Sequence, residues 1–214
     1  MKILKVNREV DRWPAEAAAA VALADANPLD CLPVSLLADS VINRNDRPVF
    51  VPEFAREGWS MEVFPAVHIG HQGKFIAPRF ASRYISGVSL TALLRPDSAP
   101  EASNPLTWIF DCALTAGPTS EGYPTAGETM DITLEYAPLR AGCAEPFEPV
   151  TLTARVTGED LRIEETVALL SRFTTLKTGD IILPASVGLS VPVRLNTSLK
   201  AAFGESAPLI TRLK

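Results

Sequence analysis

Histidine and cysteine, the side chains that most often carry chemistry, are few and dispersed in this sequence. His68 and His71 are its only two histidines, and its three cysteines, Cys31, Cys112 and Cys143, are odd in number and far apart. Structural zinc sites need Cys or His pairs at short spacing, and a disulfide framework needs paired cysteines. The sequence therefore indicates reduced thiols, and neither a zinc site nor a disulfide framework.

Glu62 is the only carboxylate in the markedly apolar stretch 61–69. Alternate residues of a strand point to the same face, so Glu62, Phe64 and His68 share a face if this stretch is a strand. Six residues separate Glu62 from His68, which is about 20 Å along a strand. Glu62 and His68 alone therefore cannot build a metal site, and we expect both histidines to be structural or surface residues.

The elements that must position these side chains are mostly strands. Apolar or alternating runs predict strands at 1–6, 48–51, 61–69, 87–94, 131–136, 150–156 and 181–183. A glycine-flanked turn at 70–73 predicts a hairpin into 74–76. Helices are expected from Asp11 and Pro14 to Asn27-Pro28, and at 33–41, 78–84 and 164–173. The fold class is therefore mixed and mainly β, which 18 prolines and 12 glycines also favour.

Composition limits the partners. The chain has 214 residues, a net charge of −5 and Lys and Arg residues scattered singly, which argues against nucleic acid. The longest apolar stretch, 15–26, contains Glu16 and Asp25 and is too short to span a membrane. Charged residues at 8, 9 and 11 interrupt the region where a signal peptide would be apolar, so we expect a cytoplasmic protein.

Three segments, taken in their order along the chain, carry a resemblance to a known family. They are 62–70 with Gly73-Lys74-Phe75-Ile76, then 110–118, then 171–183, which contains Thr175-Leu176-Lys177-Thr178-Gly179-Asp180-Ile181-Ile182. Together they resemble the fumarylacetoacetate hydrolase (FAH) family. The resemblance covers residues 48–214, so it predicts an FAH-like domain there and an N-terminal extension, residues 1–47, packed on its core. It implies a β-sandwich roll with a few short helices, a homodimer, and Mg²⁺ or Mn²⁺ used to cleave or isomerise diketo acids.

The resemblance also implies where the family's site residues fall. Its metal-binding Glu-x-Glu pair aligns with Glu62 and Phe64, its metal aspartate with Leu93, and its active-site lysine with Trp108. Its substrate-contacting Thr-Gly-Thr aligns with residues 184–186, which keep one hydroxyl, that of Ser186. No histidine precedes Glu62, where hydrolytic members have their general base.

One carboxylate cannot replace three in a Mg²⁺ site, which needs several oxygen ligands. The changes to Phe64, Leu93 and Trp108 are also coherent, because apolar groups pack together whereas a lone charge among them would be costly. We therefore expect Phe64, Leu93, Trp108 and Ser186 to line the former substrate pocket beside Glu62, with no cofactor.

Three functional hypotheses follow. The first is a non-catalytic or strongly diverged protein on the FAH fold. The second is an active hydrolase, isomerase or decarboxylase that acts on acylpyruvate-like substrates. It would bind Mg²⁺ or Mn²⁺ through displaced ligands such as Glu62 and Asp97. Ser186, Asp111 and Glu53 are further candidate site residues for this activity. The third is an unrelated β-rich binding domain. The expected assembly is a homodimer. A small-molecule ligand is a further candidate partner, whereas binding to nucleic acid or to a membrane is not expected.

Overall fold

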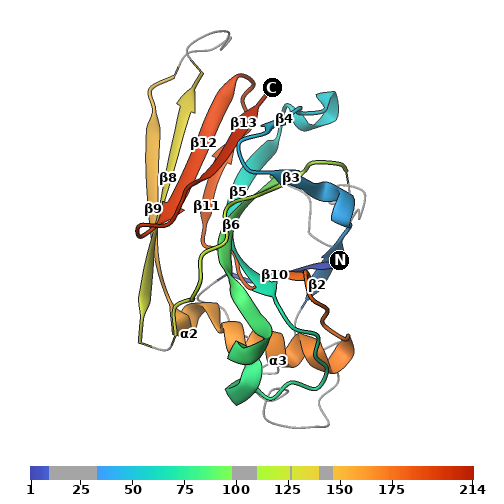
Figure 1. Ribbon diagram of the computed structural model, residues 1–214. Helices are drawn as coiled ribbons and strands as arrows, with labels where there is room; N and C mark the ends of the chain where they lie inside the picture. Colours follow the sequence, from blue (N-terminus) through green and yellow to red (C-terminus); the bar gives the residue numbers. More distant parts are fainter. Residues whose placement is uncertain (10–32, 98–109, 126, 140–146) are drawn as a thin grey trace.

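The computed structural model describes residues 1–9, 33–97, 110–125, 127–139 and 147–214 (Figure 1). These residues build two β-sheets with a few short helices, so the mixed, mainly β fold class is confirmed. The predicted helix between Asp11 and Pro28 lies outside the described residues. No helix in the described ranges is long and apolar enough to cross a membrane.

The larger sheet has eight strands in the order β2-β1-β10-β5-β6-β7-β3, with β11 also paired to β5. Its strands are β1 (Ile3–Val6), β2 (Val34–Leu37), β3 (Ile42–Arg44), β5 (Trp59–Ile69), β6 (Ile85–Pro96), β7 (Leu114–Ala116), β10 (Ile181–Leu183) and β11 (Leu189–Pro192). Pairs β1–β10 and β3–β7 are parallel, and the others are antiparallel. Strands β2 and β3 lie at opposite ends of this order, yet only residues 38–41 separate them in the chain. The sheet must therefore curl round on itself, as Figure 1 shows.

The smaller sheet has five strands in the order β4-β13-β12-β8-β9. They are β4 (Pro48–Val49), β8 (Thr129–Pro138), β9 (Val150–Thr157), β12 (Thr197–Phe203) and β13 (Leu209–Leu213). The main core lies between the two sheets, where Met61 and Val63 of β5 belong to one buried cluster with Ile132 and Leu134 of β8. A second buried cluster lies on the other face of β5, inside the curl, and includes Phe64 and Leu93.

The helices are short. They are the 3₁₀ helices η2 (Asp39–Val41), η3 (Glu53–Ala55) and η4 (Pro78–Tyr84), and the α-helices α2 (Gly158–Leu161) and α3 (Ile163–Phe173). Helix α3 follows from the sequence pattern, because Ile163, Val167 and Leu170 recur at helical spacing and are all buried. It lies beside η4 at one end of the molecule (Figure 1).

Two predicted elements are wrong. Residues 34–37 form β2 and not a helix, because the edge of β1 offers backbone partners to them: Leu37 pairs with Ile3 and Val34 with Val6. Residues 74–76 do not form a hairpin strand, because β5 takes β6 as its antiparallel partner. Gly73 instead pairs with Leu176, at the end of the loop after α3.

Residues 1–9 are anchored by two charged side chains. The Asp180 carboxylate accepts from the backbone N–H groups of Lys2 (2.7 Å) and Lys177 (2.8 Å), and its Oδ2 is 2.9 Å from Lys2 Nζ. Arg8 donates to the carbonyls of Asp160 (3.0 Å) and Leu161 (2.7 Å), and burial lowers its pKa to about 10. Strand β1 thus belongs to the larger sheet, while the domain boundary at residue 47 stays a prediction.

Candidate functional site

The candidate site lies on one face of the β5–β6 hairpin, the face inside the curl. We call it the inner face; it carries Glu62, Phe64, Leu93 and Arg95. Strand periodicity puts Glu62 and Phe64 on one side of β5, and the β5–β6 register sets Leu93 opposite Glu62. Phe64 and Leu93 are 1% and 0% exposed and belong to one buried cluster. The register thus places Leu93 opposite Glu62, with Phe64 on the same face; their role as pocket residues stays a prediction, and Trp108 lies outside the described residues.

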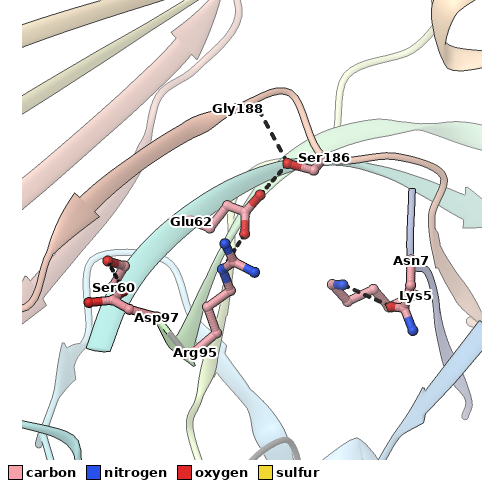
Figure 2. Close-up of polar contacts among 8 residues, drawn as sticks. All are labelled: Lys5, Asn7, Ser60, Glu62, Arg95, Asp97, Ser186 and Gly188. Carbon is pink, nitrogen blue, oxygen red and sulfur yellow. Dashed lines mark hydrogen bonds and ion pairs between the residues drawn. The ribbon is translucent and has the colours of Figure 1, made fainter. Parts of the chain in front are cut away.

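Glu62 is buried, with only 3% of its surface exposed, and both of its carboxylate oxygens are engaged (Figure 2). The Ser186 hydroxyl donates to Oε1 and in turn accepts from the backbone N–H of Gly188 at 3.2 Å. Arg95 Nε lies 2.6 Å from Oε2; this is a charge contact, because the N–H is not aligned on the oxygen as in a hydrogen bond. The carboxylate thus sits between a neutral donor and a cation of the same chain.

Sequence reasoning missed Arg95. It lies two residues after Leu93 on β6 and therefore points to the same face, and the register pairs it with Ser60 of β5. Counting two residues on from Leu93 would have placed a cation on this face. The side chain of Arg95 is 30% exposed and that of Glu62 is 4% exposed, so the pair runs from the edge of the face inward.

Asp97 is the second carboxylate near this end of the hairpin, but it has its own partner. Its Oδ1 accepts from the Ser60 hydroxyl, and its backbone N–H donates to the Gly58 carbonyl at 2.8 Å. In Figure 2 the Asp97 carboxylate points toward Ser60, away from Glu62. Asp97 and Glu62 are thus held by different partners.

Lys5 of β1 is a second cation, close to the inner face, that the sequence analysis missed. It is 2% exposed; its Nζ lies 5.3 Å from the centroid of the Phe64 ring and donates to Asn7 Oδ1 at 2.9 Å. The Asn7 amide donates to Ser35 of β2, also at 2.9 Å. A lysine inside the apolar run Ile3-Leu4-Lys5-Val6 was the available signal, because an ammonium is seldom buried without a partner.

The other candidates lie elsewhere. Asp111 is exposed beside Cys112, and Glu53 is exposed in the first turn of η3. His68 Nε2 is 2.8 Å from the buried Ser89 hydroxyl, and burial lowers the pKa of His68. His71 is exposed in the turn after β5. A catalytic role for Asp111 or Glu53 stays a prediction, as does the structural or surface role expected for the two histidines.

The described residues do not fit an octahedral Mg²⁺ or Mn²⁺. Such an ion needs several oxygen ligands converging from different directions. The inner face offers Glu62, whose oxygens are held by Ser186 and Arg95, and the neighbouring positions hold buried apolar side chains. In the described part of the chain, no group of three or more His, Cys, Asp or Glu side chains could hold a metal ion.

Comparison with known proteins gives the fold. No protein-family model and no curated protein sequence matches the chain. Among solved structures, 5-carboxymethyl-2-hydroxymuconate delta-isomerase from Mycobacterium smegmatis is 16% identical (TM-score 0.71; 99% of this chain, 78% of that chain). Maleylpyruvate hydrolase from Sphingobium sp. SYK-6, solved with manganese(II) and pyruvate, is 15% identical (TM-score 0.70; 99% and 69%). A protein from Oleispira antarctica, provisionally described as a fumarylacetoacetate isomerase/hydrolase, is 17% identical (TM-score 0.71; 100% and 93%).

These likenesses confirm the FAH-type fold expected from the three sequence segments. At 15–17% identity they establish the fold, and the chemistry must be argued from the residues of the site.

Proposed function

We propose that this protein keeps the fold of the FAH-type hydrolases and isomerases but not their metal-dependent C–C bond chemistry, and that it acts as a non-catalytic or strongly diverged member. The observation that carries this proposal is the contact between Arg95 and Glu62. The surviving carboxylate already has a cation, and that cation belongs to the chain itself.

The ion pair competes directly with a metal. A divalent ion on Glu62 would have to displace Arg95 from Oε2 or Ser186 from Oε1, or share an oxygen with one of them. Displacement of Arg95 would break the ion pair of a carboxylate that is only 4% exposed, so the metal would have to offset the loss of that contact. The chain's own cation thus replaces the charge that a metal would supply.

The apolar neighbours support the same conclusion. Phe64 and Leu93 pack in one buried cluster with Ile3, Leu183 and Leu114, which come from three further strands. A buried carboxylate at position 64 or 93 would need its own partners to avoid a large desolvation penalty. The positions that would complete a metal site therefore stabilise the fold instead.

Metal titration tests the proposal. Protein stripped with EDTA should show no stoichiometric binding of Mg²⁺ or Mn²⁺ by calorimetry. In the presence of either ion, the protein should hydrolyse acetylpyruvate no faster than the same solution without protein does. Glu62→Gln is the control, because it removes the charge that any cation at this face would need. A stoichiometric site that EDTA reverses and Glu62→Gln abolishes would overturn the proposal in favour of an active metal enzyme.

A homodimer and a small-molecule ligand remain predictions for this protein. So does its cytoplasmic location.

A further inference from the structure

Two segments that lie far apart in the sequence are free of acidic residues. Residues 70–85 and 166–179 contain no Asp or Glu but five basic residues, in a chain whose net charge is −5. These are Lys74, Arg79, Arg83, Arg172 and Lys177. A local excess of five positive charges on an acidic protein needs an explanation.

The fold joins the two segments into one surface. Gly73 and Leu176 exchange both backbone hydrogen bonds, at 3.0 and 2.9 Å. The N–H of Phe75 donates to the Ser171 carbonyl at 3.1 Å, and the N–H of Ile76 donates to the Ser171 hydroxyl at 2.9 Å. Figure 1 shows η4 and α3 side by side at one end of the molecule. The backbones of the two segments are thus held side by side, which puts their basic residues at the same end of the molecule.

Exposed aromatic rings lie among these cations. Phe75 is 72% exposed and Phe80 is 37% exposed. The guanidinium carbons of Arg79 and Arg83 lie 4.7 and 4.8 Å from the centroid of the Phe80 ring, and Lys74 Nζ lies 5.3 Å from that of Phe75. We call Lys74, Phe75, Arg79, Phe80 and Arg83 the basic–aromatic patch.

Phe75 is held in a conformation that its type disfavours. Its φ is 54°, in the left-handed region where the Cβ of a bulky residue meets the backbone, and where Gly or Asn is far better tolerated. Its ring is mostly exposed, so little packing offsets this strain. Residues with a strained backbone cluster at ligand-binding and other functional sites.

A cleft of about 250 Å³ opens beside this ring. Ile76, Ala168 and Leu169 line it together with Phe75, and Arg172 lies at its wall. Its volume is below the usual range for cofactors and drug-sized ligands, which begins at about 300 Å³. The cleft suits one apolar side chain.

From this geometry we propose that the basic–aromatic patch binds an acidic peptide segment of a partner protein, with one apolar side chain of that segment in the cleft beside Phe75. Arginine clusters recognise acidic segments by charge-assisted hydrogen bonds, and a central apolar anchor supplies most of the affinity. An anionic membrane would also attract the cations, but its lipid headgroups would not fill a cleft of the size of one apolar side chain.

Fluorescence anisotropy on the full chain tests the proposal with a labelled peptide of Glu and Gly residues around a central Leu. Binding should weaken at least about ten-fold in Arg79→Glu/Arg83→Glu and when the central Leu becomes Ser. It should also weaken when salt rises from about 50 to about 300 mM. The matched control is Arg47→Glu/Arg56→Glu, which changes the net charge equally at two exposed residues elsewhere and should bind normally.

Phe75→Asn is the most informative variant. Asparagine tolerates a positive φ, so the melting temperature should stay the same or rise while peptide affinity falls at least about ten-fold. A loss of affinity in a protein that is equally stable cannot be attributed to unfolding.

Four results would overturn the proposal. The first is peptide affinity that neither Phe75→Asn nor Arg79→Glu/Arg83→Glu changes. The second is absence of peptide binding at low salt. The third is patch-dependent binding to phosphatidylserine vesicles without binding to the peptide, which would assign the patch to a membrane. The fourth is a dimer in light scattering that Arg79→Glu/Arg83→Glu dissociates, which would assign the patch to a second copy of this chain.

Discussion

A double-mutant cycle on Glu62 and Arg95 tests the ion pair at the centre of the inner face. The single variants are Glu62→Gln and Arg95→Met, which remove one charge each and roughly keep the size of the side chain. Arg95→Met leaves a carboxylate that is 4% exposed without its cation, whereas Glu62→Gln leaves a guanidinium that is 30% exposed and can reach water. Arg95→Met should therefore be the more damaging of the two.

The structure sets the expected magnitudes. Breaking a buried ion pair costs about 3–5 kcal/mol. Because Arg95 is partly exposed and Ser186 still donates to Glu62, we expect about 2–4 kcal/mol for Arg95→Met. Glu62→Gln should cost about 1–2 kcal/mol, since an amide oxygen can still accept from Ser186. The double variant should be more stable than Arg95→Met alone, which gives a coupling energy of about 1–3 kcal/mol.

Urea unfolding followed by circular dichroism measures the four free energies, and thermal melts give a second estimate. For a chain of this length, Arg95→Met should lower the melting temperature by about 5–15 °C. The matched control is the pair Asp131–Arg155, whose Nε–Oδ1 distance is also 2.6 Å but whose side chains are 63% and 72% exposed. Its coupling energy should be much smaller than that of Glu62 and Arg95, because water screens exposed charges. If the effects of Glu62→Gln and Arg95→Met are additive to within about 0.5 kcal/mol, the reasoning is refuted.

Two further predictions concern pH. Burial raises the pKa of Asp180, but hydrogen bonds from Lys177 and Lys2 outweigh this effect, so the pKa in the folded protein is lowered. The Asp180 carboxylate therefore stabilises the fold above about pH 4, and this stabilisation is lost as the pH falls through the folded pKa. Asp180→Asn should thus cost about 2 kcal/mol at pH 7 and less at pH 3 in urea unfolding, and an equal cost at both would contradict this. Burial lowers the pKa of His68, so the unfolded state takes up the proton first and wild-type stability should decline as the pH falls below about 6.5. His68→Gln should flatten that decline between about pH 7.5 and 5.5, and an unchanged slope would assign it to other groups.

Local pattern in the sequence was enough for much of the fold. Strand β5 and helix α3 were predicted because their side-chain periods match buried faces, which a single segment reveals without its neighbours. Period two also placed Glu62 and Phe64 on one face. The three family-like segments predicted the fold itself, which the solved structures confirm.

Periodicity did not determine what Glu62 touches. Ser186, 124 residues away in the chain, was expected nearby only from the family resemblance, and Arg95 reaches Glu62 only because of the register between β5 and β6. Similarly, β2 is a strand because the edge of β1 pairs with it, although its sequence also allows a helix. Local periodicity determines which face a side chain occupies, whereas long-range pairing, set by packing and backbone hydrogen bonding of the whole sheet, determines its neighbours. Long-range pairing likewise places the basic–aromatic patch, which lies within residues 74–83, beside α3 and the cleft that Ala168 and Leu169 help to line.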